Sequence, residues 1–187
     1  MLDKILQYDR DLLIRINQFG GEYQDLFWLC ITNTLFWLPF FVWLIYFNFK
    51  SFGRKKAYRT LGYIMLTVTT TLVLTHLVKI WSMRLRPIND PDIMTHLRIL
   101  TKATQFSFFS GHACNSFSVT TIVYQLFKEK LRMPKLLFIW PLLYSFSRLY
   151  LGVHFPTDII VGMLVGIGIA LFYYQLYKRN AARLAHI

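Results

Sequence analysis

Long apolar stretches dominate the pattern of hydrophobic and polar positions along this chain. A helix that crosses a membrane needs about 20 mostly apolar residues, and five stretches approach or reach that length. They are Phe27 to Phe47, Thr60 to Trp81, Phe108 to Phe127, Lys135 to Val153 and Asp158 to Tyr177. The third is the most polar, but its length and its apolar second half favour a span over a loop. The pattern predicts an all-α fold, an integral membrane helical bundle of about five transmembrane helices.

The first 20 residues follow a different pattern. Apolar residues recur there at helical spacing with charged residues between them, namely Leu2, Ile5, Leu6, Leu12, Leu13, Ile16 and Phe19. This pattern is typical of an amphipathic helix that lies in the membrane interface, and Gly20 and Gly21 are expected to end it. We therefore expect one membrane-embedded domain over 1–187, with an interfacial helix at 1–20 and a transmembrane bundle at 27–178.

Composition excludes a soluble nucleic-acid-binding protein. The 187 residues carry a formal net charge of +12 and a pI near 9.9, which alone would suggest a polyanionic partner. However, 55% of the residues are hydrophobic, only 16% are charged, and the mean hydropathy is +0.40. Soluble domains are about 25% charged. We expect a membrane protein with no nucleic-acid partner, and the sequence leaves its oligomeric state open.

The basic residues are distributed unevenly between the two sides of the predicted bundle. Twelve of the 21 Lys and Arg residues, with a single acidic residue, fall in segments 48–59, 128–135 and 178–187. These three segments share one side of a five-span topology. Because basic loops stay in the cytoplasm, the other side is predicted to face outward. The prediction is a multi-pass protein of the bacterial cytoplasmic (inner) membrane, with the periplasm or exterior on the second side.

Three clusters of polar and charged residues lie at the predicted outer ends of the spans. Charge at the edge of a membrane span is costly and usually functional. The clusters are Lys79, Arg84 and Arg86; Ser110, Gly111 and His112; and Arg148, His154 and Asp158. Clusters at one depth can converge into one site. Cations combined with the N–H groups of a helix N-terminus bind anions, and phosphate is the commonest candidate.

Two histidines can divide the chemistry of phosphoryl transfer. His154 and Asp158 are four residues apart, so they meet on one face of a helix. A carboxylate in that place would fix the tautomer of the imidazole and stabilise its protonated form. We therefore expect His154 to attack phosphorus and His112 to protonate the leaving oxygen.

The order and spacing of these residues resemble the signature of a known family. The pattern Lys79-x6-Arg86-Pro87, then Ser110-Gly111-His112, then Ser147-Arg148-x5-His154-x3-Asp158 is similar to that of the type-2 phosphatidic acid phosphatase superfamily of membrane lipid phosphatases. The resemblance implies that Lys79, Arg86, Ser110, Gly111 and Arg148 bind phosphate. It also implies that His154 forms a phosphohistidine with support from Asp158, that His112 is the general acid, and that no cofactor or metal is required.

The sequence departs from the family pattern at two points. Phe109 stands where the family usually has a proline before Ser-Gly-His, a change expected to loosen the turn. Many members have six spans, whereas five are predicted for this chain. The N-terminal helix is therefore expected to replace the first span and to lie near the place where the substrate enters.

The sequence leaves the substrate and two side chains open. Undecaprenyl diphosphate is the first expectation, followed by lipid A, phosphatidylglycerol phosphate or phosphatidic acid, or by phosphoryl transfer to another lipid. A non-enzymatic transporter of anionic lipids is the alternative from a different class. Arg84 either contacts the phosphate or faces lipid headgroups. His76, three residues before Lys79, is expected to bridge two helices rather than to take part in catalysis.

Overall fold

The computed structural model describes residues 2–185, which form a bundle of helices. The helices are α1 (Leu2–Gln18), α2 (Glu22–Thr32), α3 (Leu38–Ser82), α4 (Gly111–Phe127), α5 (Ile139–Tyr150) and α6 (Pro156–Ala185). Short 3-10 turns occupy Thr34–Trp37, Pro87–Asn89, Met94–His96 and Pro134–Phe138. No strand occurs within 2–185, so the predicted all-α class is confirmed. Residues 1, 186 and 187 of the predicted domain lie outside the described part of the chain.

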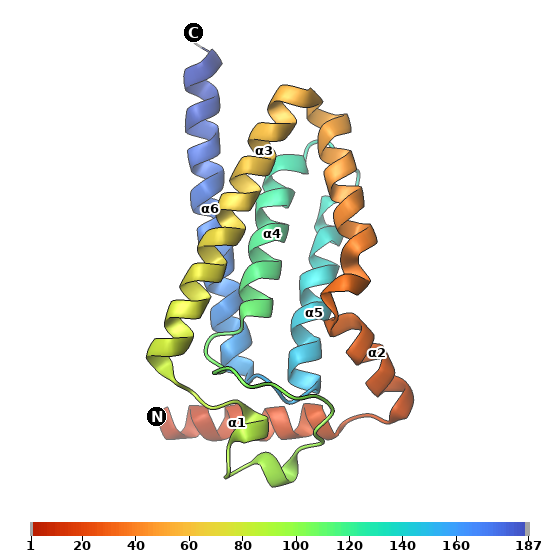
Figure 1. Ribbon diagram of the computed structural model, residues 1–187, viewed down its shortest axis with the longest axis vertical. Helices are drawn as coiled ribbons and strands as arrows, with labels where there is room; N and C mark the ends of the chain where they lie inside the picture. The colour runs from red at the N-terminus through yellow and green to blue at the C-terminus, as the bar shows by residue number, and fades with distance from the viewer. Residues whose placement is uncertain (1, 186–187) are drawn as a thin grey trace.

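Helix α1 lies across one end of the bundle, roughly perpendicular to the other helices (Figure 1). It stops at Gln18, one residue short of the glycine pair that was predicted to end it. Gly20 has a φ of 147°, and a Cβ atom there would lie 2.0 Å from the hydroxyl of Tyr150, so no larger residue fits. The inner face of α1 buries Leu13 and Asn17, and the Asn17 amide donates to the carbonyl of Tyr150 at 2.9 Å.

Helix α3 is a hairpin of two limbs rather than a single straight helix. The chain reverses at Gly53, whose φ of 69° and ψ of 167° are not helical. The sequence predicted a loop over 48–59, which is wrong, because one glycine in the left-handed region of φ makes the reversal and the flanking residues stay helical. Asn48 and Thr60 join the limbs with a 2.6 Å hydrogen bond between their side chains.

The first predicted span is not one continuous helix. It begins inside α2, is interrupted at Asn33, passes through the 3-10 turn and continues as the first limb of α3. The Asn33 side chain accepts from the backbone N–H of Leu35 at 3.0 Å and so starts a new element. By length and composition, Thr34–Asn89 and Pro156–Arg183 are apolar enough to cross a membrane. The third and fourth predicted spans correspond to the shorter helices α4 and α5, of 17 and 12 residues.

Helices α4 and α6 form the closest pair in the bundle. A Cβ atom at Gly162 would lie 2.6 Å from the carbonyl oxygen of Ser110, and one at Gly166 would lie 2.2 Å from that of Cys114. The two glycines therefore let the backbones touch, as small residues do between membrane helices. This contact fixes the N-terminus of α4 against the start of α6, where two of the predicted clusters lie.

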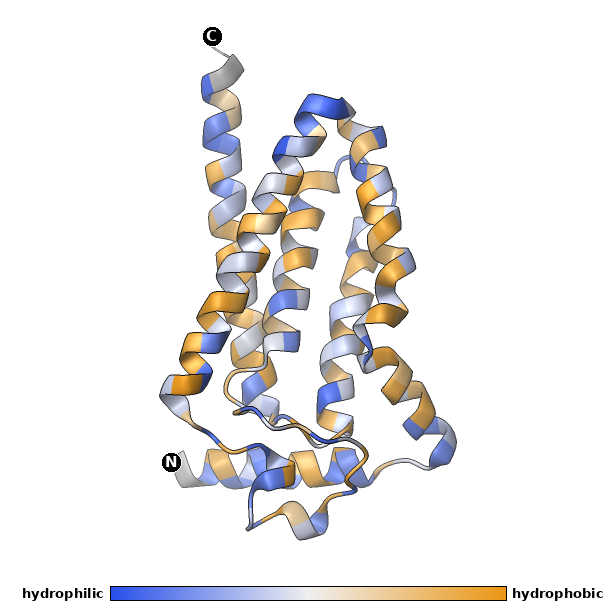
Figure 2. Cartoon of the chain, viewed as in Figure 1, coloured by the Kyte–Doolittle hydropathy of each residue, from blue (hydrophilic) through white to orange (hydrophobic). Residues whose placement is uncertain are grey.

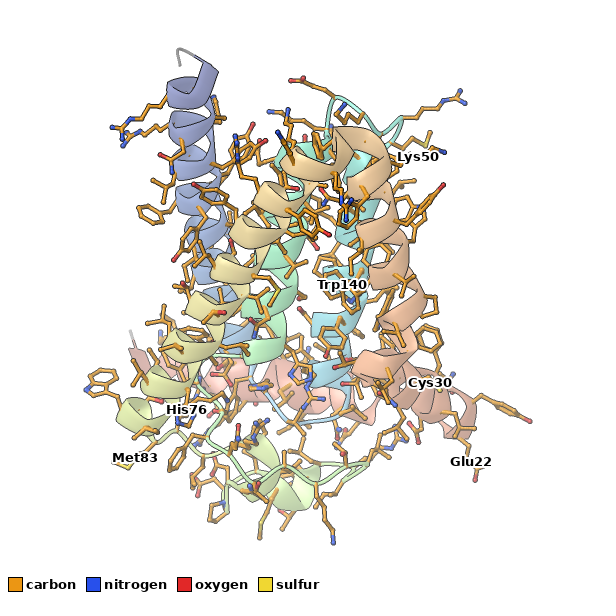
Figure 3. All side chains as sticks on the ribbon, turned by 45° about the horizontal axis from the view of Figure 1, so that its top comes forward. Glu22, Cys30, Lys50, His76, Met83 and Trp140 are labelled. Carbon is orange, nitrogen blue, oxygen red and sulfur yellow. The ribbon has the colours of Figure 1, made fainter. Side chains whose placement is uncertain are left out.

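The two ends of the bundle differ in composition. The reversal of α3, the end of α4 and the end of α6 lie together at the end opposite α1 (Figure 1). Hydrophilic residues gather at that reversal and on the last turns of α6, whereas apolar residues cover the helices between the ends (Figure 2). Figure 3 shows Lys50 at this basic end and His76 and Met83 at the other. The three basic segments thus share one side of the molecule, and the three polar clusters face the opposite side.

Candidate active site

A cavity of about 690 Å³ runs between the two limbs of α3, α4 and α5. Its length is lined mainly by apolar side chains such as Phe41, Leu44, Val68 and Val123. At the end near α1 the lining becomes polar, and it includes Lys79, Arg86, Gly111, His112 and His154. Residues from all three clusters therefore meet at one end of one cavity. The other predicted site residues, Ser110, Arg148 and Asp158, are buried beside this lining rather than part of it.

Three buried cations surround the polar end of the cavity. Lys79, Arg86 and Arg148 are 8%, 7% and 9% exposed. Lys79 Nζ donates to the carbonyl of Phe106, and Arg86 donates to those of Gln105 and Val153. These neutral partners leave the positive charge uncompensated, which is costly in a buried site unless an anion completes it.

Arg148 retains capacity to bind a further group. Its Nη1 donates to the Thr32 hydroxyl at 2.5 Å, while its Nε is buried and has no hydrogen-bond partner among the described residues. A buried guanidinium with an unused donor suits an oxyanion that is present only when substrate is bound.

The N-terminus of α4 adds backbone donors to the same site. Ser110 is fully buried and caps the helix, with its Oγ accepting from the Ala113 N–H at 3.4 Å. The next residue, Gly111, lines the cavity, where a Cβ atom would approach the side chain of Thr75 to 3.1 Å. Phe109, the residue that replaces the family proline, is 3% exposed. A helix N-terminus directed at the cations favours the binding of an anion.

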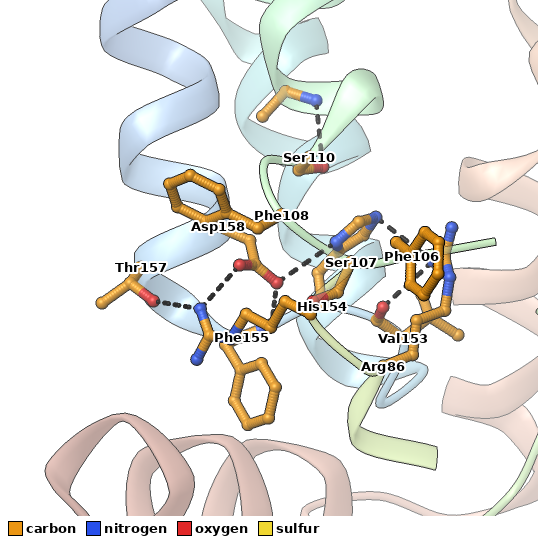
Figure 4. Close-up of polar contacts among 12 residues, drawn as sticks. Arg86, Phe106, Ser107, Phe108, Ser110, Val153, His154, Phe155, Thr157 and Asp158 are labelled. Atoms are coloured by element: carbon orange, nitrogen blue, oxygen red, sulfur yellow. Dashed lines mark hydrogen bonds and ion pairs between the residues drawn. The ribbon is translucent and has the colours of Figure 1, made fainter. Parts of the chain in front are cut away.

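His154 is held from both of its ring nitrogens (Figure 4). Nδ1 lies 3.4 Å from Asp158 Oδ2, and Nε2 lies 3.3 Å from Arg86 Nη1. The Asp158 carboxylate is fixed in turn by the Phe155 N–H at 2.9 Å. Burial, followed by the nearby charges of Arg86, Arg148 and Lys79, lowers the pKa of His154 well below its ordinary 6.5. The ring is therefore neutral near pH 7, with its proton on Nδ1 and a lone pair on Nε2 toward the cations.

His112 lines the same cavity and stacks on an aromatic ring. Its imidazole is 4.9 Å from the ring of Tyr144, with 30° between the planes. The Tyr144 hydroxyl is hydrogen-bonded to the Thr34 hydroxyl at 2.8 Å. Nothing in the sequence points to Tyr144, because a tyrosine in an apolar helix is ordinary until its neighbours are known.

Arg84 and His76, whose roles the sequence left open, occupy different places. Arg84 lies behind the site and bridges two carboxylates, Asp9 at 2.9 Å and Asp158 at 2.8 Å. His76 is exposed at the wall of the cavity rather than buried between two helices, so that expectation is wrong. Sequence reasoning missed Asp9, which α1 brings to the back of the site.

The segment between α3 and α4 covers the polar end of the cavity and is tied to the first two helices. Arg10 of α1 pairs with Asp90 at 3.3 Å and with Asp92 at 3.2 Å. Further along the same segment, Arg98 forms an ion pair with Asp25 of α2. Its backbone carbonyls are also the partners of Lys79 and Arg86, so this segment both closes the site and orients its cations.

Buried cations and two histidines at the end of an apolar helical bundle define a membrane enzyme that acts on a phosphate group. Comparison with protein families makes the assignment specific. The chain belongs to the PAP2 superfamily, whose family model matches residues 57–182. It is therefore a membrane lipid phosphatase.

Similar proteins and structures agree with this assignment. A lipid A 4'-phosphatase of Bacteroides thetaiotaomicron is 28% identical over 97% of this chain and 82% of its own length. An undecaprenyl-diphosphatase of Sulfolobus acidocaldarius is 29% identical over 94% of this chain and 76% of its own length. The crystal structure of Aquifex aeolicus LpxE matches with a TM-score of 0.69 at 27% identity, over 88% of this chain and 93% of that one.

A second solved structure shares the fold. It is a transmembrane PAP2-type phosphatidylglycerolphosphate phosphatase from Bacillus subtilis, with a TM-score of 0.72 at 23% identity. The match covers 95% of this chain and 87% of that one. The fold described above is therefore that of transmembrane PAP2 phosphatases.

Proposed function

We propose that this protein removes phosphate from a lipid phosphate or diphosphate at the outer leaflet of the bacterial cytoplasmic membrane, through a phosphohistidine at His154. The observation that carries the proposal is the environment of this residue. A neutral imidazole presents Nε2 beside Arg86, and a carboxylate lies behind its Nδ1. A nucleophile, its supporting group and the cations for phosphate thus stand in one place.

The first half of the reaction transfers the phosphoryl group to the enzyme. Lys79, Arg86 and Arg148 bind the phosphate oxygens, with the N-terminus of α4 completing the site. His154 Nε2 attacks phosphorus, and the bond from phosphorus to the lipid oxygen breaks. His112 gives its proton to that oxygen, so the lipid leaves as an alcohol, or as a monophosphate when the substrate is a diphosphate.

The second half regenerates the enzyme. Water attacks the phosphorus, His112 now accepts a proton from it, and the bond from phosphorus to nitrogen breaks. During both steps Asp158 stabilises the positive charge that the His154 ring acquires when it is phosphorylated. Inorganic phosphate leaves, and both histidines return to their starting forms.

The apolar length of the cavity supports a lipid as the substrate. It continues from the histidines along both limbs of α3 as far as Leu44 and Phe127, near the basic end of the bundle. A hydrocarbon tail that moves from the bilayer onto these side chains stays in apolar surroundings and gains close packing contacts with them. The headgroup is thereby placed at the cations.

The identity of the lipid is ranked from the similar proteins. The sequence alone placed undecaprenyl diphosphate first. The lipid A 4'-phosphatases of Bacteroides thetaiotaomicron and Porphyromonas gingivalis each align with 97% of this chain at 28% identity. We therefore place the phosphate monoester of lipid A first, and undecaprenyl diphosphate second on the likeness to the undecaprenyl-diphosphatase of Sulfolobus acidocaldarius.

The test compares His154→Gln with His96→Gln in purified protein. His96 is an exposed histidine of the covering segment, so its variant makes the same chemical change away from the cavity. His154→Gln is expected to lower phosphate release by about a thousandfold or more, the scale of losing a nucleophile, and to abolish acid-labile labelling by phosphate. His96→Gln keeps both activities. Full turnover by His154→Gln would contradict the proposal.

A panel of lipids separates the substrates and the transporter alternative. Lipid A, undecaprenyl diphosphate, phosphatidylglycerol phosphate and phosphatidic acid are presented in the same mixed micelles, and kcat/KM is measured for each. We expect the highest value for lipid A. Lipid movement across vesicles without release of phosphate from any of the four would instead support a transporter.

A further inference from the structure

Helix α1 brings a buried carboxylate to the back of the active site. Asp9 belongs to the amphipathic helix at the end of the bundle, yet its side chain is only 2% exposed. A buried carboxylate needs partners that offset the loss of water. Asp9 finds them in Arg84, beyond the end of α3, and in Thr157, at the start of α6.

The contacts of Asp9 lead directly to the carboxylate behind His154. Asp9 Oδ1 accepts from the Thr157 N–H at 2.8 Å, and its Oδ2 accepts from the Thr157 hydroxyl at 2.6 Å and from Arg84 Nη2 at 2.9 Å. The second terminal nitrogen of Arg84, Nη1, donates to Asp158 Oδ1 at 2.8 Å. In Figure 4, dashed lines join Thr157 and Asp158 to the Arg84 nitrogen between them, and a further line joins Asp158 to His154.

The guanidinium of Arg84 is fixed more firmly than one ion pair would allow. It lies 4.0 Å from the centre of the Phe155 ring and uses both terminal nitrogens on different carboxylates. Arginine is suited to this because its donors form a rigid planar fork. With Arg84 held by Asp9 on one side, the Asp158 carboxylate has one favoured orientation, in which Oδ2 faces His154 Nδ1.

We propose that Asp9 is a positioning residue of this enzyme, which acts through Arg84 and Thr157 to orient Asp158 and thereby His154. The inference rests on the phosphohistidine mechanism proposed above. It assigns to the amphipathic helix a part in the chemistry. Asp9 does not touch the substrate, and its effect is carried by Arg84, Thr157 and Asp158, which lie between it and the imidazole.

The distribution of charge around His154 also supports a positioning role for Asp9. Asp9, Arg84 and Asp158 together carry one net negative charge behind His154, whereas Arg86, Arg148, Lys79 and the second histidine, His112, lie on its other sides. When His154 accepts the phosphoryl group, its ring becomes positively charged. The net negative charge stabilises that state, and removal of the Asp9 charge leaves Arg84 and Asp158 as a neutral pair.

The experiment compares Asp9→Asn with Asp11→Asn in the full-length protein. Asp11 lies two residues further along α1 and is exposed, and its carboxylate accepts from Gln7 of the same helix at 2.9 Å. Asp9→Asn is expected to lower kcat on the order of tenfold with little change in KM, the size seen for hydrogen-bond partners behind metal-bound histidines. Asp11→Asn should leave kcat unchanged. Equal losses in the two variants would mean that the loss of any negative charge on α1 has this effect, and would overturn the proposal.

A double-mutant cycle tests whether Asp9 acts through Asp158. If it does, Asp9→Asn has little further effect on single-turnover phosphate release once Asp158→Asn is present, because the relay is already broken. If Asp9 only stabilises the fold, the two losses add. Additive losses would contradict the inference.

A spectroscopic readout makes the result independent of activity. The imidazole nitrogens of His154, assigned by difference with His154→Gln, report the hydrogen bond of Nδ1 in ¹⁵N NMR spectra. Asp9→Asn is expected to shift these signals and Asp11→Asn to leave them in place. Unshifted signals in Asp9→Asn would refute the positioning role. If His154→Gln is active, the proposed mechanism is overturned. If His154→Gln is inactive and Asp9→Asn has an unchanged kcat, only the inference about Asp9 is overturned.

Discussion

At the scale of single residues, His154 is neutral because its surroundings oppose a proton. The ring is 1% exposed, and three cations lie close enough to lower its pKa. In the proposed mechanism His154 attacks phosphorus and needs an unprotonated Nε2, so the cations proposed to bind the phosphate would also keep this nitrogen unprotonated. One set of side chains thus serves two purposes.

The pH dependence of kcat tests whether burial and the cations keep His154 unprotonated. Since the pKa of His154 is lowered from 6.5 by burial and by the cations, its ring stays unprotonated as the pH falls through 6.5. We therefore expect kcat to stay on its plateau below pH 6.5 and to fall only as the pH passes the lowered pKa. The substrate phosphate also titrates, with a second pKa of about 6, so its ionisation is followed by ³¹P NMR in the same micelles. An acidic midpoint above 6.5 after this correction would contradict the assignment.

Sequence reasoning reaches some of these residues and not others. Motif spacing predicts that Lys79, Arg86, His112 and His154 share a site, and the structure does place them on one cavity. Motif spacing does not predict the place of Asp9 behind the site, because an acidic residue on an amphipathic helix is ordinarily solvated. Only the docking of α1 against the start of α6 reveals its partners, and no local pattern encodes that long-range contact.

At the scale of elements, the contact between α4 and α6 depends on two glycines. The backbones approach closely at Gly162 and Gly166, whereas Gly168, two residues after the second contact, has open space around it. The contact determines how the N-terminus of α4 faces the turn that carries His154. A change in the packing of α4 against α6 would therefore displace the N-terminus of α4 relative to the turn that carries His154.

Alanine substitutions at Gly166 and Gly168 form a matched pair. A methyl group at Gly166 would lie 2.2 Å from the carbonyl oxygen of Cys114, so the helices must separate. We expect Gly166→Ala to destabilise the protein by about 1–3 kcal/mol, the usual cost of overpacking. Gly168→Ala is expected to be neutral or slightly stabilising, since alanine favours a helix. Thermal unfolding in detergent measures both, and an unchanged Tm for Gly166→Ala would contradict the packing described above.

Element boundaries were harder to predict than element type. Hydropathy identifies the apolar helices, because every backbone polar group in a membrane must be paired within a helix. It does not identify the reversal at Gly53, where the flanking residues are polar and basic and so read as a loop. The break at Asn33 is also hidden, since a side-chain cap inside an apolar stretch changes hydropathy very little.

At the scale of the whole molecule, the basic and catalytic ends lie opposite each other. The positive-inside rule then predicts that the reversal of α3 lies in the cytoplasm and the covering segment outside. Lys55 lies beside the reversal and Lys102 in the covering segment, and both are available for cysteine substitution in a Cys30→Ser background. In intact cells, a maleimide that cannot cross the membrane should label Lys102→Cys but not Lys55→Cys. The reverse labelling would invert the topology and place the site in the cytoplasm.

The cavity is charged at one end and apolar along the rest of its length. Its charged end therefore suits groups that dissolve in water, and its apolar part suits the hydrocarbon of the bilayer. A lipid phosphate cleaved where they meet gives inorganic phosphate, which dissolves in water, and a lipid alcohol or monophosphate, whose tail stays in the bilayer. Each product departs into the phase that solvates it best, by its own route. Partition between the two phases therefore separates the products and opposes their recombination, without any change in the affinity of the site.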